Sequence, residues 1–315
     1  MNSHHSAGHG LGKLKLESLE DRTTPSGNIT AVQYRGSIVF TGDKQSNNVL
    51  ISRVNDTVAR ITPYKSDGTK INGSYSYDFV STQNVYFNFT SGGPDSIRFA
   101  SGSPRMNFGS ISATFSDNST DYFELNGTYV SGGVSISMGG GKTTADSEVA
   151  RIYGSDIGSL DYSTNRTFVS IRTYGTDNIY IDQSNIRGGV SLVGSTAMNE
   201  FYISNTIVGG NVVVKMGDEP NGGNQWTDYF AMSNDILKSS LDVNTGEGKG
   251  RVNLNKVNAN TINIVNGSSA ADEIFLIDVS ASDCTLDGGA GLGDVAQIKG
   301  GKLAKLRISN IERLI

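Results

Sequence analysis

The chain has very little of the residues on which disulfide-bonded domains and nucleophilic enzymes depend. Its single cysteine, Cys284, excludes a disulfide bond within the chain. All three histidines, His4, His5 and His9, lie in the first ten residues. The rest of the chain therefore has no imidazole for Ser–His or Cys–His catalysis. Because no run of about 18 apolar residues occurs, no transmembrane segment is expected.

Basic residues and proline are also few. Lys and Arg total 26 against 31 Asp and Glu, a net charge of -5. A nucleic-acid binder normally has a basic surface, so no nucleic-acid partner is expected. There are 5 prolines against 39 glycines, and Ser, Thr and Asn separate many short β-branched runs. Such a composition is typical of short strands joined by tight turns, and it predicts an all-β protein.

A repeated pattern begins near residue 95, in the order acidic, variable, apolar, variable, apolar, and successive units are 22 to 29 residues apart. Each unit has a second apolar strand eight to ten residues later and a third apolar residue between the two. The paired apolar positions are Ile97 and Phe99, Phe123 and Leu125, Ala150 and Ile152, Ile179 and Ile181, Phe201 and Ile203, Phe230 and Met232, Val252 and Leu254, Ile274 and Leu276, and Ala296 and Ile298.

Three short apolar walls per unit predict one coil of a parallel β-helix, in which alternate side chains point into a central column. Chain chirality favours right-handed winding. The second strands are expected to start at Val134, Leu160, Val190, Val212, Leu241, Ile262, Leu286 and Leu306. The third apolar positions are expected at Val130, Ile157, Ile186, Ile207, Ile236, Val257, Val279 and Leu303.

The pattern divides the chain into four parts. Residues 1–26 are polar and are expected to form a disordered tail or targeting segment. Residues 27–90 keep the register poorly, and we expect an N-terminal β cap with the first irregular coils. The parallel β-helix is expected over 91–301, and 302–315 is expected to be a C-terminal cap, because the open ends of a β-helix expose unpaired strand edges.

Four stretches carry a family resemblance. The segment LESLEDRTTP (Leu16–Pro25) resembles the LEDR-x-TP (LEPR-type) N-terminal segment of planctomycete proteins of the cell envelope or exterior. Matching repeat stretches are GGNVVVKMGD (Gly209–Asp218), NTGEGKGRVNL (Asn244–Leu254) and LDGGAGLGDV (Leu286–Val295), which are similar to the β-helix arrays of that group. The resemblance implies a secreted or cell-surface location and a structural or adhesive role, and it implies no particular reaction.

The acidic position of each unit has two interpretations. It is occupied in turn by Asp95, Asp121, Glu148, Asp177, Asn199, Asp228, Gly250, Asp272 and Asp294. The spacing matches the end of a calcium-binding nonapeptide, so Asp95, Asp121, Asp177, Asp228, Asp272 and Asp294 are candidate calcium ligands. The companion glycines are mostly missing, which favours side chains that cap turns where strands begin. No cofactor is therefore expected, and calcium stays the alternative.

The segments that return from the second strand to the next unit vary most in length. Identical insertion points would project from one side of the column. The loops at 138–148, 162–177 and 216–228 are therefore expected to form one lateral ridge. Aromatic, amide and guanidinium groups in these loops suit the binding of a glycan. The alternative is that these side chains only pack the loops against the body of the protein. The candidate ligand-binding residues are Tyr162, Arg172, Tyr174, Asn224, Gln225 and Trp226.

Catalysis finds little support in the sequence, and no catalytic residue is proposed. No Asp-Asp pair occurs, and only Asp177, Glu200 and Asp228 are candidates for a carboxylate cluster. The leading hypothesis is a non-catalytic extracellular or cell-surface structural or adhesive protein, with self-association or a surface polysaccharide as partner. End-to-end assembly would join the C-terminal strands to an edge at 29–40. The alternatives are a carbohydrate-active β-helix enzyme, a polysaccharide lyase or hydrolase, and a calcium-binding repeat protein.

Overall fold

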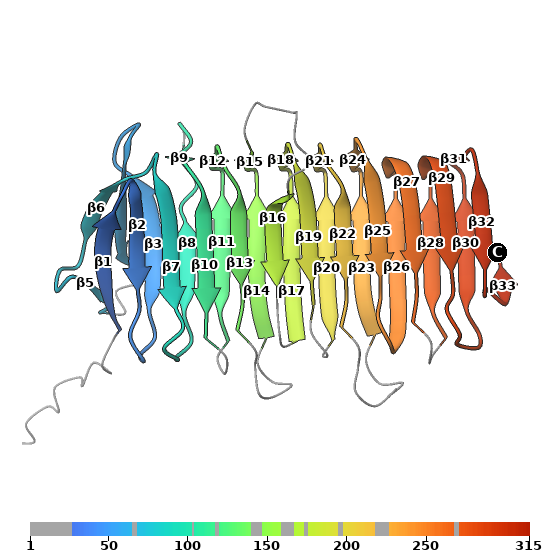
Figure 1. Ribbon diagram of the computed structural model, residues 1–315, viewed down its shortest axis with the longest axis horizontal. Coiled ribbons are helices and arrows are strands. Elements are labelled where there is room, and N and C mark those ends of the chain that lie inside the picture. The colour runs from blue at the N-terminus through green and yellow to red at the C-terminus, as the bar shows by residue number, and fades with distance from the viewer. Residues whose placement is uncertain are drawn as a thin grey trace, which may run out of the picture.

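The computed structural model describes residues 27–64, 68–102, 104–116, 120–139, 147–158, 167–172, 176–194, 198–217, 227–267 and 271–315. In these ranges the protein consists of strands and turns, without a helix. The strands lie side by side along one long axis and form an elongated rod (Figure 1). The predicted tail, residues 1–26, lies outside the described residues.

A 13-stranded sheet forms one side of the rod and is called face 1. Its consecutive members pair in parallel from β3 onward, each with its equivalent in the next unit. They are β3 (Asn48–Arg53), β8 (Ser96–Phe99), β11 (Tyr122–Asn126), β14 (Ser147–Tyr153), β17 (Thr176–Asp182), β20 (Asn199–Ser204), β23 (Thr227–Ser233), β26 (Lys249–Asn255), β28 (Glu273–Ile277), β30 (Val295–Lys299) and β33 (Arg313–Leu314).

The other long row of strands is called face 2. Its members again pair in parallel with their equivalents one unit away. They are β2 (Ser37–Thr41), β7 (Asn84–Phe89), β10 (Ile111–Phe115), β13 (Val134–Ser137), β16 (Thr167–Arg172), β19 (Gly189–Val193), β22 (Val212–Lys215), β25 (Ser240–Asn244), β27 (Asn258–Val265), β29 (Ser280–Asp287) and β32 (Leu306–Ser309).

Two-residue strands form a short row between the two faces: β9 (Asn107–Phe108), β12 (Tyr129–Val130), β15 (Asp156–Ile157), β18 (Asn185–Ile186), β21 (Ile207–Val208), β24 (Ile236–Leu237) and β31 (Lys302–Leu303). The longer strands β27 and β29 contribute to both this row and face 2. The chain thus runs from face 1 through the short row to face 2 and back in each unit. This all-β arrangement of long parallel sheets is consistent with the predicted β-helix.

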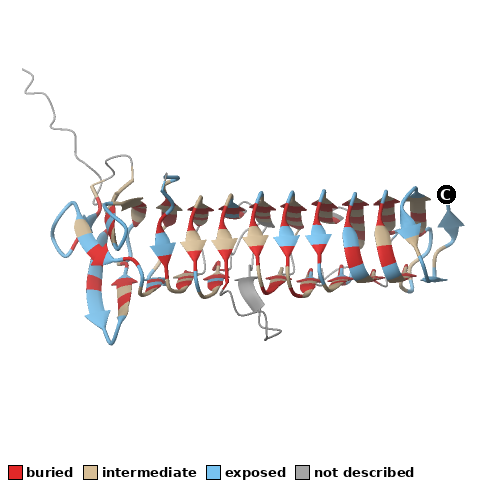
Figure 2. Cartoon of the chain, turned by 90° about the horizontal axis from the view of Figure 1, so that it is seen from above, coloured by how far each residue is buried: buried red, intermediate tan, exposed pale blue. Residues whose placement is uncertain are grey.

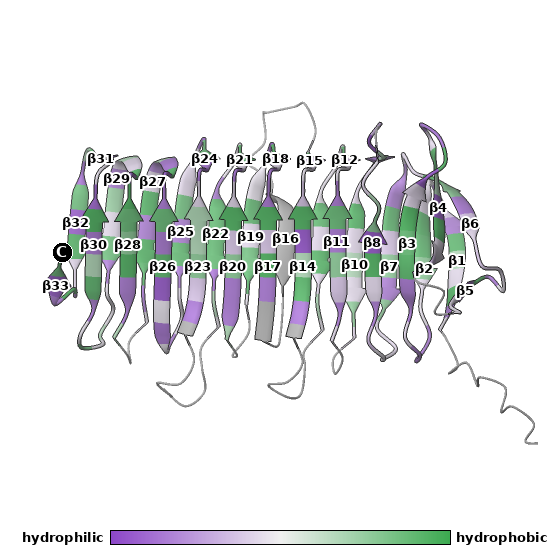
Figure 3. Cartoon of the chain, turned by 180° about the vertical axis from the view of Figure 1, so that it is seen from behind, coloured by the Kyte–Doolittle hydropathy of each residue, from purple (hydrophilic) through white to green (hydrophobic). Residues whose placement is uncertain are grey.

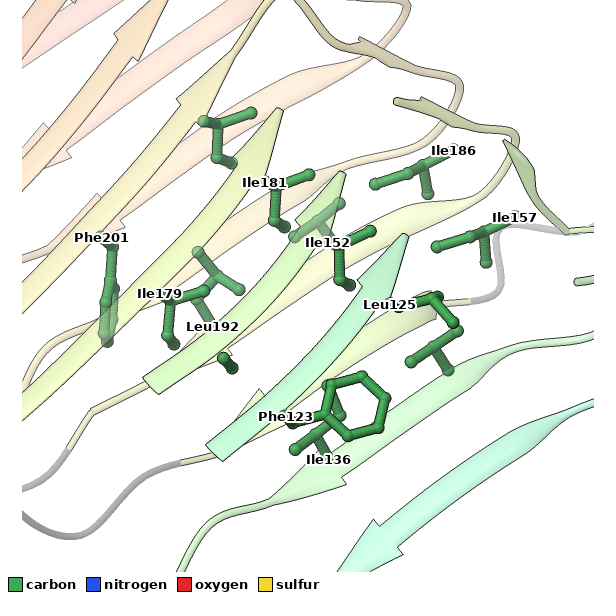
Figure 4. Close-up of a cluster of buried hydrophobic side chains, with 14 of the residues drawn as sticks. Phe123, Leu125, Ile136, Ile152, Ile157, Ile179, Ile181, Ile186, Leu192 and Phe201 are labelled. Atoms are coloured by element: carbon green, nitrogen blue, oxygen red, sulfur yellow. The ribbon is translucent and has the colours of Figure 1, made fainter. Parts of the chain in front are cut away.

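The predicted apolar columns of face 1 are confirmed, although Ile298, near the C-terminal end, is only partly buried. Phe123 is paired with Ala150 and Leu125 with Ile152, and the same register continues along the rod. Because side chains alternate along a strand, these residues are buried while their neighbours face solvent (Figures 2 and 3). Their side chains fill the space between the two faces, as the labelled cluster around Phe123 and Ile152 shows (Figure 4). Cys284 belongs to the same core.

The third apolar column is only partly as predicted. Val130, Ile157 and Ile186 are buried and in register, but Ile207 and Ile236 face solvent. Their neighbours occupy the core position instead, since Val208 is paired with Ile186 and Leu237 with Val208. Where two apolar residues are adjacent, the period of two along a strand decides which points inward, and composition alone does not. The buried Val257 and Val279 precede the short row, where Ala259 and Ala281 take the core position.

Two of the second strands were placed wrongly. The residue that pairs with Ile262 and Leu306 is Cys284, and not Leu286, which lies two residues further along β29. The residue that pairs with Val134 and Val190 is Val169, and not Leu160, which lies outside the described residues. In this unit the long connection therefore runs from β15 to β16, whereas in the units of β13 and β22 it runs from face 2 back to face 1. The three long loops do not share one insertion point, so the single lateral ridge expected from the sequence is wrong at its middle member.

The N-terminal part of the chain contains antiparallel strand pairs. β1 (Asn28–Tyr34) pairs with β2, β4 (Val58–Pro63) pairs with β3, and β6 (Tyr77–Val80) pairs with β4. β5 (Lys70–Ile71) adds to β1, and next to it the Asn72 side chain bonds both backbone groups of Ala31. The edge at 29–40 that end-to-end assembly would use is therefore largely paired: β2 lies between β1 and β7.

The C-terminal end is arranged differently. Residues 302–315 add one more turn of strands, in which β32 pairs with β29 and β33 with β30. Leu306 and Ile308 are 41% and 38% exposed, whereas their partners one unit earlier, Cys284 and Leu286, are fully buried. The last strands therefore carry core-type residues on an exposed surface, visible in pale blue at this end of the rod (Figure 2).

The register of the core makes a first prediction. Leu254 is fully buried on β26, and the adjacent Asn255 points outward. Leu254→Asp places an unpaired carboxylate in the column and should lower the free energy of unfolding by about 4 kcal/mol or more. Asn255→Ser should change it by about 0.5 kcal/mol or less. Urea unfolding followed by circular dichroism measures both, and similar losses would contradict the assigned register.

Candidate functional site

The acidic position of each unit lies at the corner where a face 1 strand begins, and it is buried. Asp95, Asp121, Asp272 and Asp294 are each at most 1% exposed. The carboxylate of one unit accepts the backbone N–H of the same position in the unit before: Asp95 N–H donates to Asp121 Oδ1 at 2.9 Å, and Asp272 N–H donates to Asp294 Oδ1 at 2.8 Å. Each of these carboxylates therefore caps a backbone N–H group of the neighbouring unit, and not one of its own turn.

The same column continues beyond the predicted residues at both ends. Asn47 donates its backbone N–H to Asp95 Oδ1 at 2.7 Å, and Asp294 donates its own to Glu312 Oε2 at 2.7 Å. Gly288, on the far side of the corner, leaves the necessary space, since an added Cβ there would lie 2.8 Å from Asp294 Oδ2. The side chain of Asp177 lies outside the description. Within the described ranges, no group of three His, Cys, Asp or Glu residues is arranged to hold a metal ion, and calcium binding stays a hypothesis.

Burial makes these carboxyl groups hard to ionise. It raises the pKa of Asp95 to about 8 and that of Asp272 to about 7, and it also raises the pKa of Asp294. Among the residues that the structure describes, Oδ2 of each of the three is buried and has no hydrogen-bond partner. A carboxylate held this way is costly, whereas the neutral acid keeps Oδ1 as an acceptor.

A second polar column, which the sequence analysis missed, lies where the chain leaves face 1. Ser155 Oγ accepts the backbone N–H of Thr128 at 3.3 Å, and Asp235 Oδ1 accepts that of Thr206 at 2.8 Å. Burial raises the pKa of Asp235 to about 7. The signal is a Ser, Thr or Asp two residues after the end of β11, β14, β17, β20 and β23, whereas β26 and β28 are followed by valine at this position. Both columns satisfy backbone donors at the corners of the rod.

The buried acids make a second prediction, on pH. Their folded pKa values, up to about 8, lie above the value of about 3.9 for an unfolded Asp. The folded state thus binds more protons between about pH 4 and about pH 8, and stability falls as pH rises through this window. We expect the melting temperature, measured by calorimetry, to fall from pH 5 to pH 8, and a rise would contradict the assignment.

Asp272→Asn tests the source of this effect. An amide fits the column, because Asn199 already occupies it and donates both its backbone N–H and Nδ2 to Asp228 Oδ1. The melting temperature of the variant should fall less between pH 5 and pH 8 than that of the unmodified protein. Asp56→Asn, at a side chain 85% exposed, is the matched control and should leave the slope unchanged. A large rise in melting temperature on adding calcium at pH 8 would instead favour the calcium interpretation.

The outward side of face 1 carries a continuous stack of aromatic and guanidinium groups. Arg98 lies 3.7 Å from the ring centre of Tyr122, and the Arg151 guanidinium lies 5.8 Å from Tyr122 and 5.3 Å from Tyr180. Tyr180 and Tyr202 stack with centroids 5.1 Å apart and planes 4° apart. We call this stack the tyrosine–arginine ladder; its members are Tyr64, Arg98, Tyr122, Arg151, Tyr180, Tyr202 and Tyr229.

Strand register builds the ladder. Parallel pairing sets Arg151 beside Tyr180 and Tyr180 beside Tyr202, about 4.8 Å apart, which is the distance at which cations and rings stack. Carboxylate and amide oxygens of the same strands fix the hydroxyl groups: Tyr202 donates to Glu200 at 3.2 Å and Tyr180 to Asn178 at 3.3 Å. Burial and the nearby Glu200 raise the pKa of Tyr202 to about 12, so this phenol stays protonated.

A hollow of about 300 Å³ lies beside the middle of the ladder. Its polar groups are held in place: Asp182 Oδ1 accepts hydrogen bonds from Ser204 Oγ at 2.7 Å and from Asn205 Nδ2 at 2.9 Å. Tyr153, whose hydroxyl donates to Gln183 at 3.0 Å, is 43% exposed. The residues that line the hollow are Arg151, Ile152, Tyr153, Tyr180, Ile181, Asp182, Tyr202 and Ser204. The guanidinium donor of Arg151, the carboxylate acceptor of Asp182 and the exposed phenol of Tyr153 thus meet on one open surface.

The residues predicted to bind a ligand are not those of this hollow. Tyr162, Tyr174, Asn224, Gln225 and Trp226 lie outside the described residues, and their role stays a prediction. Arg172 ends β16 on face 2, where its backbone pairs with Ser137 and Val193. The ladder left little signal in the sequence. Its central members Arg151, Tyr180 and Tyr202 occupy the position between the two apolar columns, but the neighbouring units have Glu124 and Ala231 there.

Comparisons of the chain with family models, with curated proteins and with solved structures gave no match. In the described part of the chain, no helix is long and apolar enough to cross a membrane.

Proposed function

We propose that the chain is a non-catalytic extracellular or cell-surface protein with a structural or adhesive role, which binds a polysaccharide along face 1. Its architecture on this proposal is a right-handed parallel β-helix with an N-terminal β cap. The observation that carries the proposal is the tyrosine–arginine ladder with the adjoining hollow. Residues 1–26 and the resemblance to planctomycete envelope proteins support the location.

The chemistry of the hollow favours a sugar chain. A pyranose ring has apolar C–H faces, which suit exposed aromatic rings, and hydroxyl groups, which suit fixed donors and acceptors. Tyr180 and Tyr202 cover each other's faces by stacking and so offer ring edges and hydroxyls, while the exposed Tyr153 offers more of its ring. Because the ladder follows the rod axis over consecutive strands, the surface suits an extended polymer better than a compact molecule.

The arrangement of carboxylates favours binding over catalysis. Lyases and hydrolases of sugars need an acid or base, usually from paired carboxyl groups, at the scissile bond. Of the acids offered by the sequence, Asp228 is 3% exposed and its Oδ1 accepts two bonds from Asn199, while Glu200 accepts the Tyr202 hydroxyl. In the hollow itself, Asp182 is the one carboxylate among the described lining residues.

End-to-end assembly remains part of the proposed role. Support comes from the exposed Leu306, Ile308 and Leu314 on the last strands, since apolar groups beside unpaired strand edges favour association with another chain. The paired state of β2 disfavours a partner strand at 29–40. We therefore propose that the C-terminal strands, and not the N-terminal ones, make the contact.

The glycan proposal makes a third prediction. Tyr153→Ala should weaken retention by polysaccharides about tenfold, because an aromatic contact contributes about 1 kcal/mol or slightly more. Tyr86→Ala is the matched control, since Tyr86 is 40% exposed on β7 of the opposite face. Affinity gel electrophoresis against neutral and acidic polysaccharides measures retention, and circular dichroism checks the fold. Equal behaviour of the two variants would contradict the site, whereas release of new chain ends would favour the enzyme alternative.

A further inference from the structure

In the part of the chain that the structure describes, some arginines on face 1 form an ion pair with a carboxylate of the protein, and Arg151 does not. Arg98 bonds Glu124 at 3.2 Å, and Arg251 lies 3.4 Å from Glu273. Arg151 has neither an ion-pair partner nor a hydrogen-bond acceptor among the described residues, although it is exposed on the same surface. Glu124 is in register with Arg151 on the adjacent strand β11, but its carboxylate accepts hydrogen bonds from Arg98 and Tyr122 instead. The charge of Arg151 is therefore available to a ligand.

The neighbours of Arg151 hold its guanidinium in a fixed place. The group lies over Tyr122 on one side and Tyr180 on the other, and it lines the hollow together with Asp182 and Ser204. A guanidinium stacked on rings keeps its five N–H donors in its own plane, where they match the two oxygens of a carboxylate or sulfate. Such a bidentate contact is stronger than a bond between neutral groups.

The charges around Arg151 limit the spacing of anions on the ligand. Asp182 and Glu200 lie on the next two strands, β17 and β20, towards the C-terminal end. Both are acceptors, and Asp182 keeps lone pairs free after its bonds to Ser204, Asn205 and Gln183. A second anion here would be repelled, whereas the hydroxyl groups of a neutral sugar would donate to these oxygens. An acidic unit at Arg151 should therefore be followed by a neutral one.

We propose that Arg151 is the anion-binding residue of face 1, and that the ligand is a polysaccharide in which acidic sugars are separated by neutral ones. This inference rests on the proposed function and goes beyond it in naming the charge pattern. A homopolymer of uronic acid, or a densely sulfated chain, places negative groups against Asp182 and Glu200 and should bind less well. A neutral chain leaves Arg151 without an acceptor.

The test combines a change in the protein with a change in the polymer. The probes are hyaluronan and unsulfated chondroitin, whose acidic and neutral sugars alternate, the carboxyl-reduced form of each, and polygalacturonate. The unmodified protein should bind the alternating polymers about tenfold more tightly than their reduced forms, and also more tightly than polygalacturonate. Arg151→Gln should lower affinity for the alternating polymers to the level of the reduced forms and leave the reduced forms unaffected.

Two further variants control the experiment. Lys44→Gln removes an exposed cation from the N-terminal region and should change nothing. Arg151→Lys keeps the positive charge but lacks the planar guanidinium group. Its affinity for the alternating polymers should lie between that of the unmodified protein and that of Arg151→Gln. Equal binding of acidic and reduced polymers overturns the anion site and leaves the proposed function standing. Stronger binding of polygalacturonate overturns the spacing argument. If no polysaccharide in the wider neutral and acidic panel binds, the proposed function itself fails.

Discussion

The parallel pairing of each strand with its own equivalent in the next unit is the interaction on which the rest of the structure depends. It repeats at about 4.8 Å and brings the same position of successive units into contact. Phe123 meets Ala150 in the core, Asp95 meets Asp121 at a corner, and Tyr180 meets Tyr202 on the surface. Each set of equivalent positions therefore forms a column along the rod, and the properties of a column depend on how its side chains interact when stacked.

Stacking has opposite effects on different side chains. Apolar residues and aromatic rings gain from a neighbour at this spacing, whereas like charges do not. The corner column resolves the conflict by burial, which favours the neutral acid and lets one oxygen accept a backbone N–H. On face 1 the cations alternate with rings, so that Arg98 and Arg151 are separated by Tyr122. The same geometry thus explains a stable corner and an open, polar surface.

The sequence predicted the repeating parts of the fold because each apolar column is a regular series of similar residues. It failed where single units depart from the series. In the adjacent apolar pair Ile207-Val208, the sequence did not show which residue points inward. In another unit a long connection precedes the second strand, so Val169 and not Leu160 occupies the expected position. Tertiary pairing decided both cases.

The tyrosine–arginine ladder was missed for a different reason. Its positions hold Arg, Tyr and Ala along successive strands, so they show no common residue type, and their contacts exist only once register brings the strands together. The acidic series was found, but its depth of burial and its bonds between units were not readable from spacing.

Constant register also bears on how such a chain can change over generations. Phe230, Val252, Ile274 and Ala296 follow one another in neighbouring strands at equal steps along the sequence. Each contacts chiefly its two neighbours, so loss or duplication of one whole step would join strands that already fit, and would alter the rod length by about 4.8 Å. Loss or gain of a whole unit should therefore disrupt the fold much less than an insertion of one residue. Such an insertion would move the apolar side chains of a strand from the core to the solvent side.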